Sequence, residues 1–343
     1  MKLRVSFFLF LMMTVAVSSI YAGIEEYPEQ VKVVSIISSK DQVKQPALFY
    51  VPPSEKPRPL LVALHTWSSH YDQGGGEVSY ANWCIEHGWI FIHPHFRGPN
   101  NNPKALGSEF VVSDIEDAVK YAKGHANVDP ERVYLIGASG GGHAALLMAG
   151  RKPEIWAAVS AWCPIFDVEK WWQEKALENS QYAKQMEAAC GGKPGESAEI
   201  DRQYRIRSPK NWLHPESTLP VQIATGVHDG RTGSVPFTHS LRAFNALADP
   251  KDKLTEKEIT EFYRTQSSSH LGFEPFFDPQ YHRKIHFRRN SSMCQVTIFE
   301  GTHEIIHGAG LSWLANQIKG EKPVWDLNSS KLNGKYGGSD SGK

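Results

Sequence analysis

A serine in a glycine-rich turn is the first residue in this sequence whose setting suggests chemistry. Ser139 lies at the centre of Gly137-Ala-Ser-Gly-Gly141, which fits the pattern G-x-S-x-G. A serine raised above a sheet needs a sharp, strained turn, and larger flanking side chains would collide with the neighbouring backbone. The same turn directs the backbone N–H of Gly140 toward the reacting centre. The pattern therefore predicts that Ser139 is a nucleophile.

A serine hydroxyl becomes reactive when an imidazole takes its proton and a carboxylate orients that imidazole. Asp229 follows the expected strand 221–225, and His303 follows the expected strand 296–299. Both would thus lie at the carboxyl ends of strands, after Ser139 and in the chain order serine, acid, histidine. We predict that Asp229 is the acid and His303 the base of a catalytic triad.

A zinc motif overlaps the predicted base. Residues 303–307 read His-Glu-Ile-Ile-His and fit H-E-x-x-H, in which both histidines must lie in one helix. Gly301 follows the preceding strand closely and favours a loop at His303. The longer metalloprotease form needs a third histidine where Trp313 stands. We therefore expect neither a metal nor another cofactor, and keep a zinc peptidase as an alternative.

Several nearby residues could take related roles. Asp167 could replace the predicted acid, although a turn residue of the following segment is the simpler interpretation. His228 and His307 compete with the predicted base. Arg97 could bind a substrate carboxylate, but a structural role in its loop explains it equally well.

The elements that must position these residues alternate between strands and helices. Continuous apolar runs indicate buried strands, and small or periodic apolar residues indicate helices. Strands are expected over 31–37, 47–51, 60–64, 89–93, 132–137, 157–162, 221–225 and 296–299, and helices over 78–87, 111–123, 138–149 and 305–318. This alternation predicts an α/β fold with a mostly parallel sheet, helices on both faces and a site at the carboxyl ends of the strands.

The chain divides into a leader, one domain and a tail. Residues 1–22 have a charged start, an apolar run shorter than a membrane span and small residues for cleavage, as in a signal peptide. We therefore expect a secreted or periplasmic protein with no integral membrane span after cleavage; an uncleaved anchor is the alternative. The domain is expected over 23–320, with a lid-like insertion at 165–218, a second insertion at 250–294 and a flexible tail at 321–343.

Composition narrows the class of protein. Of 343 residues, 41% are hydrophobic and 22% charged, which excludes disordered and multi-pass membrane chains. Lys+Arg and Asp+Glu are both 37, so no basic field indicates a nucleic-acid partner. The ten tryptophans could stack on a ligand. The four cysteines could form one or two disulfides after export, with Cys163–Cys190 preferred and the pairing otherwise open.

Together these motifs resemble the α/β-hydrolase superfamily, in its branch of prolyl-oligopeptidase-like hydrolases and carbohydrate esterases. The matching pieces span about residues 45–318 and are Leu64-His65, Phe96-Arg97-Gly98, Gly137–Gly141, Asp229 with Val235-Pro236, and Gly301–Glu304. The resemblance implies an α/β-hydrolase fold with a lid. It also implies an oxyanion hole made by the backbone N–H groups of Gly140 and Trp67.

The function expected from these motifs is that of an exported serine hydrolase. We expect an esterase that removes acyl groups from a polysaccharide or oligosaccharide through an acyl-enzyme, with Trp67, Arg97 and Trp162 binding the substrate. The partner is thus a small-molecule or carbohydrate ester, and the oligomeric state stays open. A small serine peptidase of the same branch is the main alternative, and a non-catalytic binding protein is a further one.

Overall fold

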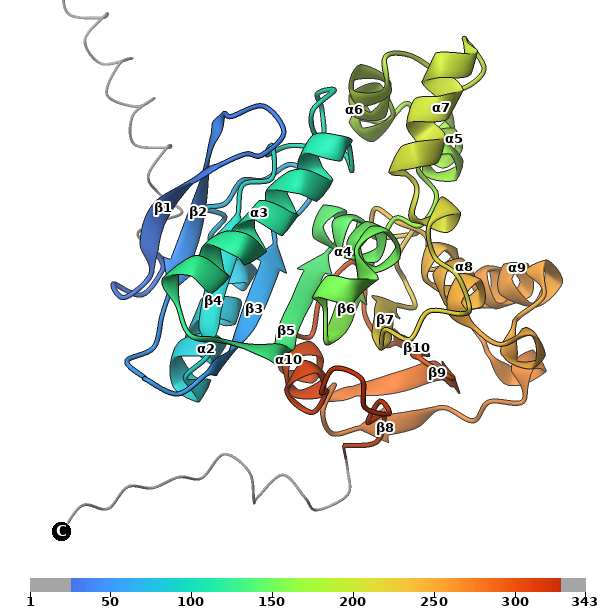
Figure 1. The fold of residues 1–343 in the computed structure, drawn as a ribbon. Helices are drawn as coiled ribbons and strands as arrows, with labels where there is room; N and C mark the ends of the chain where they lie inside the picture. The colour runs from blue at the N-terminus through green and yellow to red at the C-terminus, as the bar shows by residue number, and fades with distance from the viewer. Residues whose placement is uncertain (1–25, 328–343) are drawn as a thin grey trace, which may run out of the picture.

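The structure, a computed structural model, describes residues 26–327. The predicted signal peptide and residues 328–343 of the predicted tail lie outside this range. Within it, one ten-stranded sheet runs across the whole molecule (Figure 1). In spatial order the strands are β1 (Lys32–Ile37), β2 (Lys44–Tyr50), β4 (Ile90–Pro94), β3 (Arg58–Leu64), β5 (Val128–Ala138), β6 (Ala158–Trp162), β7 (Val221–Gly226), β10 (Cys294–Phe299), β9 (Arg283–Ser291) and β8 (Phe276–Asp278).

The strands from β4 to β10 pair in parallel, whereas the two strands at each edge pair antiparallel. Parallel strands need crossover connections, and helices supply them on both faces. One face carries α3 (Glu109–His125), α4 (Gly140–Arg151), α8 (Thr238–Leu247) and α9 (Glu256–Thr265), and the other carries α2 (Val78–His87) and α10 (His307–Ala315). The prediction of an α/β fold with a mostly parallel sheet is confirmed.

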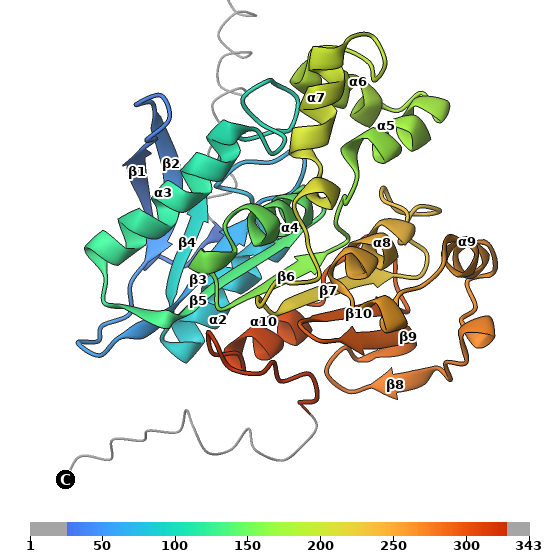
Figure 2. The ribbon, with the colours of Figure 1, turned by 45° about the vertical axis from the view of Figure 1, so that its right-hand side comes forward.

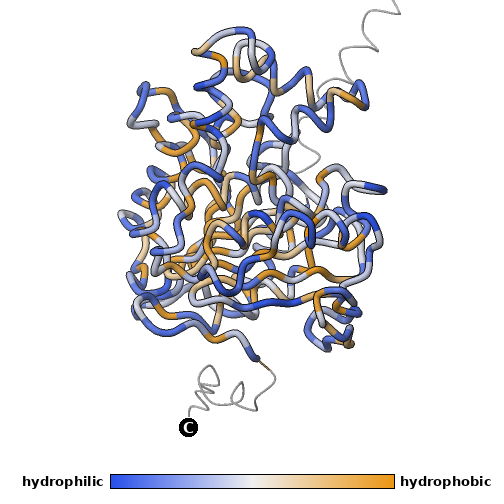
Figure 3. Tube along the Cα trace, turned by 90° about the vertical axis from the view of Figure 1, so that its right-hand side faces the viewer, coloured by the Kyte–Doolittle hydropathy of each residue, from blue (hydrophilic) through white to orange (hydrophobic). Residues whose placement is uncertain are grey.

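Alternation along each strand divides the core into two layers. In β3, Leu60 and Val62 belong to the layer under α3 and α4, while Leu61 and Ala63 belong to the layer under α2 and α10. Both faces are covered, so the strand is apolar throughout. The hydrophobic chain segments accordingly gather in the middle of the molecule (Figure 3).

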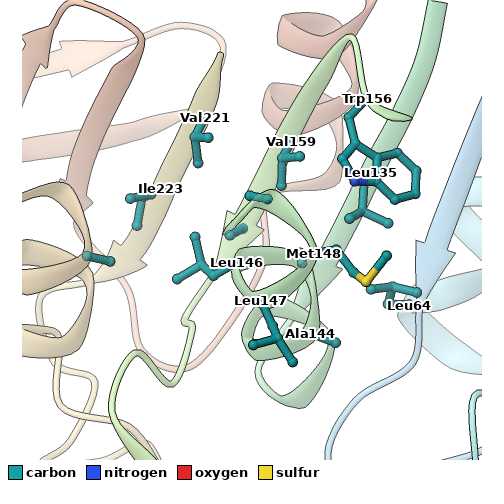
Figure 4. Packing of buried hydrophobic residues seen from close by; sticks show 14 of the residues in the cluster. Leu64, Leu135, Ala144, Leu146, Leu147, Met148, Trp156, Val159, Val221 and Ile223 are labelled. Atoms are coloured by element: carbon teal, nitrogen blue, oxygen red, sulfur yellow. The ribbon is translucent and has the colours of Figure 1, made fainter. Parts of the chain in front are cut away.

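Helix α4 packs centrally against this sheet. Its residues Ala144, Leu146, Leu147 and Met148 lie among side chains of the neighbouring strands, as Figure 4 shows. Its first turn consists of three glycines, and a methyl group on Gly141 would overlap the carbonyl oxygen of Leu64. The glycines thus let the helix start close against β3, which fixes where the preceding serine stands.

The predicted lid segment forms three helices, α5 (Val168–Leu177), α6 (Gln181–Cys190) and α7 (Ala198–Arg207). They lie together as a separate group at the top of the molecule (Figures 1 and 2). Their buried side chains form a third apolar cluster with Trp67 of the loop after β3 and Val235 of the loop after β7. The group therefore packs against loops at the carboxyl ends of the strands.

Two predicted segments differ from expectation. The predicted second insertion, 250–294, contributes to the central sheet, because its strand β9 pairs antiparallel with β10. Residues 321–327, which the sequence assigned to the flexible tail, include positions that pack on the domain, since Trp325 stacks on Trp313 with ring centroids 5.4 Å apart and Leu327 is buried.

The preferred disulfide is absent. All four cysteines are free thiols, and each is buried. Cys163 and Cys190 do not face each other, because Cys190 belongs to the lid cluster while the thiol of Cys163 contacts the carbonyl oxygen of Glu304 at 3.3 Å.

Candidate functional site

The strand β5 ends in the turn that carries Ser139. This residue has φ 58° and ψ −118°, a region that side-chain-bearing residues rarely adopt. A Cβ atom on Gly137 would lie 2.5 Å from the carbonyl carbon of Gly141, so only glycine fits there. The turn thus has the strained backbone that the sequence pattern predicts, and it leaves Ser139 half-exposed.

The candidate acid and base are joined directly. His303 Nδ1 lies 2.8 Å from Asp229 Oδ2. Asp229 is fully buried, and it also accepts hydrogen bonds from the Thr225 hydroxyl and from the backbone N–H groups of Gly230 and Val235. These donors compensate the buried charge and fix the carboxylate, which in turn fixes the imidazole.

The turn of Ser139 is tied to the segment beside this pair. The backbone N–H of Ser139 donates to the carbonyl oxygen of Trp162 at 2.8 Å. The next residue, Cys163, has its sulfur within 4.8 Å of ligand atoms of both Asp229 and His303. Three segments far apart in sequence therefore meet at the carboxyl ends of β5, β7 and β10.

The second imidazole nitrogen, His303 Nε2, has no hydrogen-bond partner among the described residues, Ser139 Oγ included. It is a buried acceptor left unused by the protein. Catalytic hydrogen bonds are often long in the absence of substrate and shorten when substrate binds. An imidazole held at Nδ1 and free at Nε2 can accept a proton at that second nitrogen.

The electrostatics of His303 follow from the same contacts. Burial alone lowers the pKa of His303, but the hydrogen bond that His303 donates to the Asp229 carboxylate, together with the contact with Cys163, outweighs burial and raises the pKa above its ordinary value. Burial also raises the pKa of the Cys163 thiol, so this neighbour is neutral near pH 7. The carboxylate is thus the charge that stabilises a protonated His303.

Backbone donors gather beside the turn. The N–H of Gly140 is in the first turn of α4, where a helix has no acceptor for it and where its dipole is positive. A methyl group on Gly140 would lie 2.6 Å from the backbone nitrogen of Trp67. The two groups predicted to form an oxyanion hole are therefore neighbours.

Arg97 does not take the substrate-binding role that was predicted for it. Its guanidinium bonds to Asp41 at 2.8 Å and to Ser38 at 2.7 Å, both in the turn after β1, and to Asp114 of α3. Arg97 is only 9% exposed. Because its donors are committed to the protein, we do not assign it to substrate binding, and the structural interpretation fits.

The tryptophans are placed in packing positions. Trp162 is fully buried, and its indole N–H donates to Ser160 at 2.8 Å, so its side chain cannot reach a substrate. The indole of Trp67 is 2% exposed, donates to Gln185 of α6 at 2.7 Å and packs edge-on against Trp171. The predicted substrate contacts of the Trp162 and Trp67 side chains are therefore not supported, while the Trp67 backbone stays a candidate donor.

The rival motif does not form a zinc site. His303 lies in an irregular loop, and α10 begins only at His307, which packs against Tyr80 with ring centroids 5.0 Å apart. The group of described residues whose ligand atoms are close enough to share a metal ion is Cys163, Asp229 and His303, without His307.

The other competitors have different partners. His228 pairs with Glu300 at 2.8 Å. Asp167 caps the N-terminus of α5 and bonds to Lys210. Cys163, expected from the sequence only as a disulfide partner, adjoins the site; its place directly after β6 was the available signal.

The profile of the prolyl oligopeptidase family matches residues 79–287, more than half of the chain. This chain belongs to the prolyl oligopeptidase family. That family is one of serine hydrolases with the α/β-hydrolase fold, so the resemblance stated from the motifs is confirmed.

Members and neighbours of this family include both peptidases and esterases. The uncharacterized peptidase YtmA of Bacillus subtilis is 24% identical over 202 residues, which cover 58% of this chain and 69% of that protein. An acetylxylan esterase of Coprinopsis cinerea is 30% identical over 123 residues, which cover 33% of each chain. The acylaminoacyl peptidase of Pyrococcus horikoshii superposes with a TM-score of 0.59 at 13% identity, over 90% of this chain and 45% of that one.

The last likeness shows a shared fold and no more. Since this chain spans less than half of the Pyrococcus enzyme, the activity of that whole protein does not carry over. Among residues 26–327, no helix has the length and apolarity needed to cross a membrane.

Proposed function

We propose that this protein is an exported serine esterase that removes small acyl groups, with acylated carbohydrate as its substrate class. The observation that carries the proposal is the hydrogen bond of 2.8 Å between His303 and the buried Asp229. The strained turn that presents Ser139 supports it. Export rests on residues 1–22, whose pattern is that of a signal peptide.

The proposed reaction begins when Ser139 Oγ attacks the ester carbonyl carbon and its proton passes to His303 Nε2. Negative charge on the carbonyl oxygen is stabilised by the N–H groups of Gly140 and Trp67. The carbonyl re-forms, the bond to the alcohol oxygen breaks, and His303 gives that oxygen its proton. Water then attacks the acyl-enzyme with His303 as base, and the acid is released.

Asp229 stays ionised throughout. It holds the imidazole in the tautomer whose Nε2 is free, and it stabilises the imidazolium that forms in each half-reaction.

The small acyl group is inferred from packing around the donors. The indole rings of Trp67 and Trp171 are both almost fully buried in the lid cluster, next to the Trp67 backbone nitrogen. We infer that these rings leave room beside the Gly140 turn for a short acyl group only. The choice of an acylated carbohydrate as substrate is supported by the likeness to an acetylxylan esterase. Stacking of sugar on Trp67 or Trp162 does not support it, because both side chains are buried.

The experiment compares nitrophenyl esters of increasing acyl length, acetylated xylo-oligosaccharides and aminoacyl nitroanilides on the mature protein. We expect kcat/KM to be highest for acetyl esters, to fall as the acyl chain lengthens, and to vanish in Ser139→Ala. A preference for octanoyl over acetyl esters would contradict the small acyl site. Activity that survives in Ser139→Ala would contradict the proposal as a whole.

A small serine peptidase is the second candidate. The likeness to a Bacillus subtilis peptidase over 69% of that protein favours it. The same assay separates the two: hydrolysis of aminoacyl nitroanilides with a higher kcat/KM than any ester would establish the peptidase.

A further inference from the structure

We propose that Asn100 is a third donor to the oxyanion, acting through its side-chain amide. This inference rests on the proposed function and adds a catalytic residue that the motifs do not contain. Asn100 lies in the loop after β4, two residues beyond the segment Phe96-Arg97-Gly98. The residue is 3% exposed.

The orientation of the Asn100 amide is set by its neighbours. Oδ1 accepts the backbone N–H of Leu106 at 2.7 Å, which identifies the oxygen and turns the NH₂ group the other way. The backbone N–H of Asn100 donates to the carbonyl oxygen of Trp67 at 2.9 Å. Asn100 is thus tied to the same loop that carries the candidate donor Trp67.

The NH₂ group then lies beside the nucleophile's turn. A methyl group on Gly140 would lie 3.0 Å from Asn100 Nδ2, and 2.6 Å from the nitrogen of Trp67. Three nitrogens, those of Gly140, Trp67 and the Asn100 amide, therefore surround one point at the start of α4. Within residues 26–327 no hydrogen bond to another residue occupies Nδ2, so its hydrogens are available to a ligand.

The NH₂ group of Asn100 is not among the buried polar atoms that lack a partner, so it is open to solvent and can donate to a ligand oxygen in place of water. Anionic oxygen is the acceptor that the reaction creates at this place. A fixed donor aimed at developing charge lowers the transition state more than the ground state, because it needs no reorganisation. Asn100 should consequently act on kcat rather than on KM.

Two substitutions separate donation from loop support. Asn100→Asp keeps the acceptor for Leu106 and removes the donor, whereas Asn100→Ala removes both. The neighbouring Asn101 is exposed and serves as the matched control as Asn101→Ala. We expect kcat on an acetyl ester to fall about 10²-fold in both Asn100 variants, with KM nearly unchanged, and to stay at the wild-type value in the control.

The direct readout is a crystal structure of the protein after reaction with a fluorophosphonate. The phosphonyl oxygen should lie within hydrogen-bond distance of Asn100 Nδ2, and urea unfolding of Asn100→Asp should match wild type. An adduct whose oxygen lies beyond reach of Nδ2, or wild-type kcat in Asn100→Asp, would overturn the role of Asn100 alone. Failure of Ser139 to take the label would overturn this inference together with the proposed function.

Discussion

His303 and Asp229 meet at 2.8 Å although 74 residues separate them, and the bond leaves His303 Nε2 as an unused acceptor. The sheet accounts for the meeting, because β7 and β10 are adjacent parallel strands and both side chains follow their carboxyl ends. Such a pair orients one nitrogen for proton transfer while the buried carboxylate balances the charge.

Replacing Asp229 by asparagine should therefore disable the base without disturbing the fold. Asparagine offers an NH₂ group to Nδ1 and favours the tautomer in which Nε2 carries the proton. We expect kcat to fall by about 10⁴-fold. The measurement is steady-state hydrolysis of an acetyl ester, with circular dichroism to verify folding; a loss under tenfold in folded protein would contradict the assigned role.

The raised pKa of His303 sets the direction of the pH dependence. The base works only when neutral, so kcat/KM should rise with pH through an apparent pKa above the ordinary value of about 6.5. In Asp229→Asn, which lacks the carboxylate, the residual activity should also increase with pH, but through a lower apparent pKa than in wild type. A wild-type profile that is already flat at pH 6 would disagree with this assignment.

Stability should show the opposite trend with pH. The pairing of His303 with Asp229 raises the pKa in the folded state, so its contribution is full below the unfolded value. That contribution is lost as pH rises through the folded value. Urea unfolding of wild type and His303→Gln at a series of pH values isolates it, and the difference between them should shrink toward high pH.

Arg97 should matter for stability and not for turnover. Arg97→Met would leave the buried Asp114 without its cation, which costs on the order of 3–5 kcal/mol. The exposed Arg202 pairs with the exposed Glu199, so Arg202→Met is a control with little expected effect. Denaturant unfolding measures both. A rise in KM with unchanged stability in Arg97→Met would restore the substrate-binding role.

Gly140 should tolerate no side chain. The methyl group of Gly140→Ala would lie 2.5 Å from Trp67 Cα, so the loop that carries the second donor must shift. We expect a loss of about 10²-fold in kcat from that displacement. Gly124 of α3 is the matched control, because a methyl group there meets nothing within 4 Å. Gly124→Ala should keep full activity and add about 0.5–1 kcal/mol of stability.

The parallel strands and the turn of Ser139 were predictable because their signals are local. Strands buried on both faces are apolar throughout, as in β3, and the glycines around Ser139 follow from close backbone approach. The strand β9 was missed because only Ile285 and Phe287 of its central residues face the core, between charged neighbours. Its pairing depends on β10, which follows it in sequence but belongs to the sheet interior.

The prediction of substrate-binding side chains was not supported, for a different reason. Whether an arginine or tryptophan after a strand reaches the site depends on partners that are distant in sequence. Arg97 is held by Asp41, 56 residues earlier, and the indole of Trp162 packs between Tyr281 and Phe299. Residue type alone could not distinguish these packing roles from contact with a ligand.

The most direct test of the account asks which atom a serine-directed reagent modifies and whether His303 drives that reaction. Wild type treated with a fluorophosphonate should carry a single adduct, located on Ser139 by peptide mass spectrometry. The adduct should be absent in Ser139→Ala, and it should form at least about 10³-fold more slowly in His303→Gln. An adduct on any other residue, or equally fast labelling without the imidazole, would contradict the central claim.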